Sequence, residues 1–165
     1  MKIPFAQIDA FVLSESKGRP FTGNPAGVMP LDTWLDDDVL QAIAQENNLS
    51  ETAFIVPDAS GASDYELRWH TPAAEVALCG HATLASGHYV LSANAARRRV
   101  TFRSRQSGIL TVERATNGYD LTLPAWVAAP RPLLPRHRSS VRCTATASAS
   151  RHCSSTLERS KFAPH

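Results

Sequence analysis

The stretch RWHTPAAEVALCGHAT, residues 68–83, links a predicted strand to a predicted helix. Residues 65–70 alternate apolar and polar side chains, which is typical of a strand. The pattern changes at Gly80, and we expect residues 80–94 to form a helix rich in Ala, Ser and Gly. Because small side chains let backbones approach closely, the rest of the domain is expected to enclose this helix.

Strand-like segments and one more helix are predicted on both sides of this stretch. Residues 36–46 place apolar side chains at helical spacing behind acidic residues, which suit the positive end of a helix dipole. The 65–70 strand is expected to pair with its neighbour at 51–56, and Asn117-Gly118 predicts a hairpin. The other predicted strands are residues 5–13, 26–29, 100–104, 108–114 and 119–123, with a loop at 18–25. Strands and helices mixed without strict alternation predict an α+β domain with mostly antiparallel strands.

Charge and composition divide the chain at about residue 130. Residues 1–130 carry 10 Lys+Arg against 14 Asp+Glu, whereas residues 131–165 carry 7 against 1. We therefore expect a domain over 1–130 and a basic, Ser- and Arg-rich tail over 131–165. The tail has few apolar residues to offset its ordering entropy, which predicts disorder or poor packing. Its composition is also typical of GC-rich DNA translated in a wrong frame, which is our hypothesis for its origin.

The same composition argues against several classes of partner. The basic tail lacks regular Lys/Arg clusters and interleaved aromatic residues, so nucleic-acid binding is not expected. The three cysteines, at 79, 143 and 153, show no CxxC spacing, so we expect neither a disulfide framework nor a zinc site. No segment has the apolar length of a membrane helix, and Gln7 and Asp9 interrupt any signal-peptide core. We expect a cytoplasmic protein without a membrane partner.

Glu51 is the first candidate for chemistry. It lies between a predicted helix and a predicted strand, where rigid structure can hold a carboxylate toward a cleft. That placement suits a general acid or base. The alternative is an ordinary capping or surface carboxylate, which most glutamates are.

Gly80 and His81 are the second candidates. Backbone N–H groups at a helix start are free to receive an anion, so a carboxylate-bearing substrate is the natural ligand. The alternative is a glycine-assisted turn followed by a histidine. Cys79 suits either a nucleophile or base at a helix start or a small buried residue. His81 and His88 lack the spacing of helical zinc ligands, even with His70 nearby, so no metal is expected.

The polar loop Gly23-Asn24-Pro25 is the third candidate, because the Asn24 amide can both donate and accept hydrogen bonds to a ligand. Alone, the tripeptide is simply a turn. No GxGxxG, P-loop or nucleophile-elbow motif is present, so we expect neither a nucleotide cofactor nor acyl-transfer serine chemistry.

Taken in order, these motifs resemble the PhzF family. The matching segments are FTGNPAGV (21–28), NLSETAF (48–54), TPAAE (71–75) and CGHATLA (79–85), and the resemblance extends over roughly residues 4–125. The family is named for the phenazine-biosynthesis isomerase and shares its fold with diaminopimelate epimerase. The resemblance implies a pair of similar α+β domains, each with strands wrapped around a central helix, here residues 80–94.

The resemblance also implies a function. It implies a cofactor-independent isomerase or epimerase, with Glu51 as the acid/base residue, His81 as its catalytic partner, and Asn24, Ser50 and Gly80 near a small carboxylate-bearing substrate. No metal or organic cofactor is implied.

Residues 131–165 do not resemble the family's second domain. We therefore expect a truncated, N-terminal half of the enzyme, which a homodimer would complete. The alternative is a non-catalytic half-domain that binds a ligand or dimerises.

Overall fold

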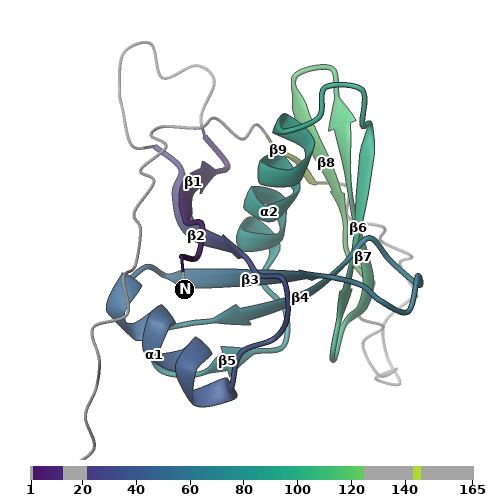
Figure 1. Ribbon diagram of the computed structural model, residues 1–165. Coiled ribbons are helices and arrows are strands. Elements are labelled where there is room, and N and C mark those ends of the chain that lie inside the picture. The colour runs from purple at the N-terminus through teal and green to yellow at the C-terminus, as the bar shows by residue number, and fades with distance from the viewer. Residues whose placement is uncertain (1, 13–21, 125–142, 146–165) are drawn as a thin grey trace, which may run out of the picture.

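A computed structural model describes residues 2–12, 22–124 and 143–145 of the chain (Figure 1). Most of the predicted 18–25 loop and of the 131–165 tail lies outside these residues. The strands are β1 (Ala6–Ala10), β2 (Asn24–Pro30), β3 (Glu51–Pro57), β4 (Tyr65–His70), β5 (Glu75–Val76), β6 (Arg99–Ser104), β7 (Gly108–Ala115), β8 (Gly118–Thr122) and β9 (Cys143–Ala145). The helices are α1 (Asp37–Asn47) and α2 (Gly80–Ser92). Neither helix in the described part of the chain has the length and apolar character to cross a bilayer.

The strands form a single mixed sheet in the order β1-β2-β3-β4-β6-β7-β8-β9, with β5 paired to β4. Two pairs of neighbours are parallel, β2 with β3 and β4 with β6, and the other described pairs are antiparallel. The predicted pairing of β3 with β4 is confirmed, as is the β7–β8 hairpin across Asn117-Gly118. The predicted α+β class with mostly antiparallel strands is therefore confirmed.

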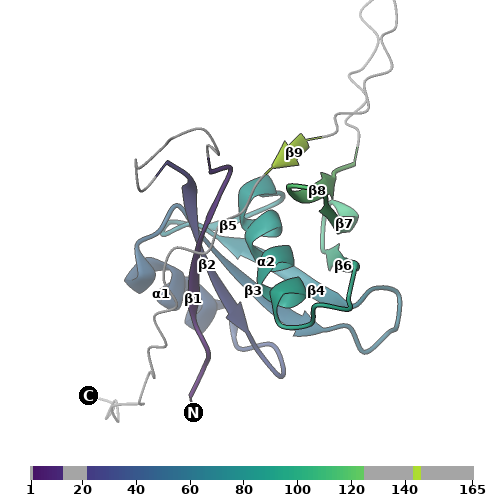
Figure 2. The ribbon, with the colours of Figure 1, turned by 90° about the horizontal axis from the view of Figure 1, so that it is seen from above.

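Helix α2 lies inside the curve of this sheet. Figure 2 shows it between β1 and β2 on one side and β6, β7 and β8 on the other. Nine of its thirteen residues are buried, so the prediction of an enclosed helix is confirmed. The helix ends at Ser92, two residues before the predicted end. The Asn94 side chain accepts a hydrogen bond from the Ala96 N–H and so favours a turn at that point.

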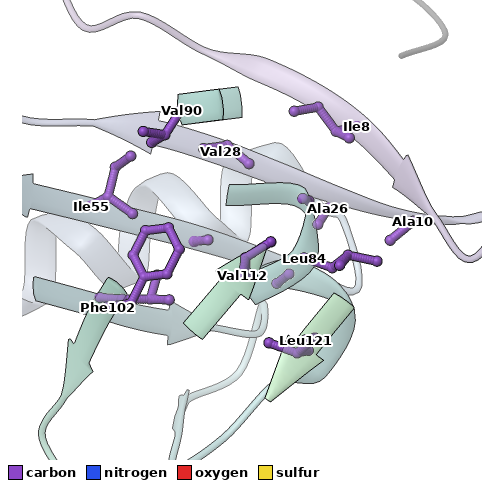
Figure 3. Packing of buried hydrophobic residues seen from close by; sticks show 14 of the residues in the cluster. Ile8, Ala10, Ala26, Val28, Ile55, Leu84, Val90, Phe102, Val112 and Leu121 are labelled. Atoms are coloured by element: carbon purple, nitrogen blue, oxygen red, sulfur yellow. The ribbon is translucent and has the colours of Figure 1, made fainter. Parts of the chain in front are cut away.

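The core fills the space between α2 and the sheet. Figure 3 shows Val28, Ile55, Leu84, Phe102 and Val112, from four strands and the helix, gathered around this space. A smaller apolar cluster lies on the opposite face of the sheet beneath α1: Met29, Leu31, Leu40, Phe54 and Val56. The middle of β3 is thus buried on both faces, which explains its continuous apolar run.

Two short strands were not predicted. Strand β5 is formed where Glu75 binds the buried Arg68 of β4 through two hydrogen bonds, of 2.7 and 2.6 Å. This pairing is a tertiary contact that the local pattern does not show. Strand β9 pairs with β8 at residues 143–145, inside the segment predicted as a tail.

Gly87 is where α2 comes closest to the sheet. A Cβ at this position would lie 2.4 Å from Val112 Cγ1 and 2.6 Å from Val112 Cβ. A change of the Val112 rotamer cannot remove the second clash, because Cβ does not move with χ1. The absence of a side chain at Gly87 therefore sets how deeply α2 sits.

We predict that Gly87→Ala destabilises the domain. Overpacking a close contact costs about 1–3 kcal/mol, which outweighs the gain of about 1 kcal/mol from replacing glycine by alanine in a helix. Urea unfolding should show a lower midpoint for this variant. Gly80→Ala in the same helix is the matched control, because its Cβ would lie 3.8 Å from the nearest side chains. Equal stability of the Gly87→Ala and wild-type chains would contradict the packing account.

Candidate active site

The starts of β2, β3 and α2 meet at one end of the curved sheet. Strands β2 and β3 run parallel with Ala26 opposite Glu51, so the first residue of β3 lies beside the third residue of β2. His81, in the first turn of α2, contacts both Ser50 and Glu51 at this place. Because parallel strands and a helix all begin here, residues far apart in the chain converge.

Local backbone features position these side chains in the site. Asn48 adopts a left-handed conformation that ends α1 and turns the chain directly into Ser50 and Glu51. Directly before β2, a Cβ at Gly23 would lie 2.8 Å from the Ala10 carbonyl oxygen. Glycine at that position lets Asn24 and Pro25 pair with β1, so these two residues are the start of a strand and the prediction of a loop is wrong there.

Glu51 and His81 form the centre of the site. Glu51 Oε2 lies 3.1 Å from His81 Nε2, and the two side chains are 19% and 10% exposed. The distance is that of an ion pair, but Oε2 is buried and makes no hydrogen bond to a described residue. This oxygen therefore keeps its lone pairs available to accept a proton.

Two neighbours fix the protonation of the His81 ring. The Ser50 hydroxyl donates to the Pro25 carbonyl at 3.0 Å, so its oxygen can accept from His81 Nε2, 3.3 Å away. On the other side, Cys79 Sγ lies 3.3 Å from Nδ1 and can donate its proton there. The arrangement assigns the ring proton to Nε2, the nitrogen that faces Glu51.

Burial controls the charges in this pocket. Burial lowers the pKa of His81, and the nearby Glu51 carboxylate opposes that shift. Burial also raises the pKa of the Cys79 thiol to about 12, against weaker opposing hydrogen bonds from the Ala82 and His81 amides. At neutral pH the imidazole is therefore neutral and Cys79 is a protonated thiol.

The structure brings the candidate residues from the sequence together. Ser50 Oγ lies 3.4 Å from Asn24 Oδ1 as well as beside His81, and Gly80 begins α2 next to them. The first backbone N–H groups of a helix have no partner within the helix. The His81 and Ala82 amides hydrogen-bond the Cys79 sulfur, which leaves the Gly80 N–H for an anion.

The other two histidines weighed as metal ligands lie elsewhere. His70 contacts Gln41 of α1 at 3.0 Å, and His88 contacts Tyr119 of β8 at 3.1 Å. Instead, the potential ligand atoms of Glu51, Cys79 and His81 all lie within 4.8 Å of one another. Sequence reasoning missed the contact between Cys79 and His81. The position of Cys79 directly before the helix start was the one sequence feature that could have indicated this contact.

The arrangement suits proton transfer. A buried carboxylate oxygen without a hydrogen-bond partner can take up a proton, and a neutral imidazole N–H beside it can donate to a developing negative charge.

Comparisons with known proteins show what this chain is similar to. The family model for phenazine biosynthesis-like proteins (PhzC-PhzF) matches residues 8–159, a range that extends beyond the 4–125 expected from the motifs. An uncharacterized isomerase of Pseudomonas aeruginosa is 48% identical over 125 residues, which cover 76% of this chain and 45% of that protein. The human phenazine biosynthesis-like domain-containing protein is 44% identical over 140 residues, covering 79% and 46%.

Solved structures show the same likeness. A PhzF-family protein from Enterococcus faecalis matches with a TM-score of 0.64 and 43% identity, covering 82% of this chain and 49% of that one. The chain spans about half the length of the relatives it matches. Its α+β sheet around α2 corresponds to one half of the PhzF and diaminopimelate epimerase-like fold. The chain belongs to the PhzF family of phenazine biosynthesis-like proteins.

Proposed function

We propose that this chain provides the acid/base group of a cofactor-independent PhzF-type isomerase or epimerase. Glu51 takes a proton from a carbon atom of a small carboxylic acid and returns it to another carbon or to the other face. The observation that carries the proposal is the buried Glu51 Oε2, without a hydrogen-bond partner and 3.1 Å from His81 Nε2. Two curated relatives are named isomerases, which supports the reaction class.

The proton balance of the step is simple. The C–H bond breaks, its proton goes to Glu51, and its electron pair delocalises into the substrate's conjugated carboxylate. The His81 Nε2–H, which lies beside Glu51, stabilises the negative charge as it develops on the substrate. Protonation by Glu51 at the new position completes the reaction without a metal or organic cofactor.

The substrate carboxylate fits the start of α2. The Gly80 backbone N–H and the positive end of the helix dipole favour an anion there. Asn24 and Ser50 add polar groups on the adjoining edge. In this arrangement the acidic end of the substrate is held at α2 while the reacting carbon faces Glu51.

We predict that Glu51→Gln abolishes proton exchange while preserving substrate binding, because the amide keeps the shape of the side chain and cannot act as a base. The test incubates the chain in D2O with a panel of small amino and unsaturated carboxylic acids and measures deuterium uptake by mass spectrometry. The loss should appear in kcat rather than in KM. A Gln variant with unchanged kcat would remove Glu51 from the role. Absence of exchange by the wild-type chain on every acid would favour the non-catalytic half-domain.

We predict a smaller loss for His81→Asn than for Glu51→Gln. Asparagine retains an N–H donor in the site, so it keeps part of the charge stabilisation, and general-acid or hydrogen-bond assistance contributes roughly 10²–10⁴-fold. The same exchange assay gives the comparison. A loss equal to or greater than that of Glu51→Gln would reverse the two roles.

We also propose that two copies pair to complete the site. The chain matches 45% of the length of one curated relative, and among the described residues the site is built from the starts of β2, β3 and α2. A symmetric pair would place a second, similar surface over it. Sedimentation velocity should therefore show a dimer. A monomer that remains at high concentration would contradict the pairing, and exchange activity in that monomer would leave the role of Glu51 intact.

A further inference from the structure

Glu51, Cys79 and His81 together form a set of potential metal ligands. One atom from each, a carboxylate oxygen, a sulfur and an imidazole nitrogen, lies within 4.8 Å of the other two. Cys79 and His81 are buried, and Glu51 is half-buried. The three residues come from two elements, the start of β3 and the start of α2 with its N-cap. The Cys79 thiol donates to His81 Nδ1 but does not itself take part in moving a proton between Glu51 and carbon.

The three ligand atoms lie somewhat farther apart than those of a tetrahedral metal site. Zinc binds sulfur at about 2.3 Å and nitrogen or oxygen at about 2.0–2.2 Å, which places ligand atoms roughly 3.3–3.8 Å apart. Cys79 Sγ lies 3.3 Å from His81 Nδ1, and Glu51 Oε2 lies 3.1 Å from His81 Nε2, so the two contacts use opposite nitrogens of the ring. A metal takes one ring nitrogen, and the residue that contacts the other nitrogen must rotate to bring its ligand atom to the same centre. One ligand atom of each residue already lies within 4.8 Å of the other two.

We propose that Glu51, Cys79 and His81 bind a divalent cation of the borderline-soft kind, such as Zn²⁺. Thiolate and imidazole select such a metal over Mg²⁺ and Ca²⁺, which prefer all-oxygen sites. Three protein ligands leave a fourth position open for water or a substrate carboxylate. On binding, the Cys79 S–H bond is broken, the proton is released to solvent, and the sulfur donates an electron pair to the metal.

The consequence for activity is inhibition, and this part rests on the proposed function. A metal bound to Glu51 occupies the lone pair that would accept the substrate's proton. It also ties the His81 ring to the cation. Zinc therefore blocks the step instead of assisting it, and its removal restores the free carboxylate.

The binding test uses absorption spectroscopy and does not depend on activity. The full chain carrying Cys143→Ser and Cys153→Ser retains Cys79 as its one thiol. Titration with Co²⁺ should give a thiolate-to-metal charge-transfer band that saturates at one metal per chain and is displaced by Zn²⁺. Cys79→Ser should abolish the band. Glu51→Gln and His81→Asn should each weaken binding by at least the roughly 10–100-fold loss seen for changes in residues that only orient ligands.

A matched control lies on the same helix. His88→Asn alters a histidine that contacts Tyr119 and should leave the titration unchanged. X-ray absorption of the zinc-loaded Cys79-only chain needs no further variant, and it should show one sulfur among the metal's neighbours. A zinc environment without sulfur, or a charge-transfer band that survives Cys79→Ser, would overturn the proposal.

Measuring proton exchange distinguishes the proposed metal site from the proposed isomerase activity. If proton exchange occurs, Zn²⁺ should suppress it and a chelator should restore it. Exchange that continues undiminished in the zinc-saturated chain would overturn the inhibitory role. Cobalt binding by a chain that exchanges no protons would support the metal site and contradict the proposed isomerase activity.

Discussion

The contact between Gly87 and Val112 is the constraint on which the arrangement of the site depends. Helix α2 fits inside the curved sheet because Gly87 places no atom where Val112 already lies. With the helix at this depth, its first turn reaches the starts of β2 and β3. His81 Nε2 then contacts Glu51, and Cys79 contacts Nδ1 on the other side of the His81 ring. The active-site geometry is thus a consequence of how the core packs, because packed interiors transmit small shifts with little compliance.

The fold and the site differ in how far the sequence predicts them. Periodicity and turn residues predict both helices and most strands, because those signals are local. The 51–56 strand and the hairpin at Asn117-Gly118 are examples. Strand β5 depends on a contact of Glu75 with Arg68, and β9 depends on pairing with a distant strand, so neither has a local signal. The family motifs identify Glu51 and His81 as candidates, but the contact of His81 with Cys79 requires the three-dimensional arrangement.

Burial gives the pocket two different chemical properties. By disfavouring charge, it keeps His81 neutral and Cys79 protonated, so the ring can donate from Nε2 to the Ser50 oxygen while the thiol donates to Nδ1. The same groups become metal ligands when a cation replaces the thiol proton. Proton transfer and metal binding therefore compete for the same atoms. The metal-free chain is expected to exchange protons, and the zinc-bound chain is not.

The relation between Glu51 and His81 can be measured directly by ¹⁵N NMR of the histidine ring nitrogens, with His81→Asn used to assign the His81 signals. At neutral pH the structure predicts a neutral His81 ring protonated at Nε2. The Nε2 signal should change in Glu51→Gln, and the Nδ1 signal should change in Cys79→Ser. A ring protonated at Nδ1, or one whose signals do not respond to Glu51→Gln, would contradict the arrangement of these three side chains.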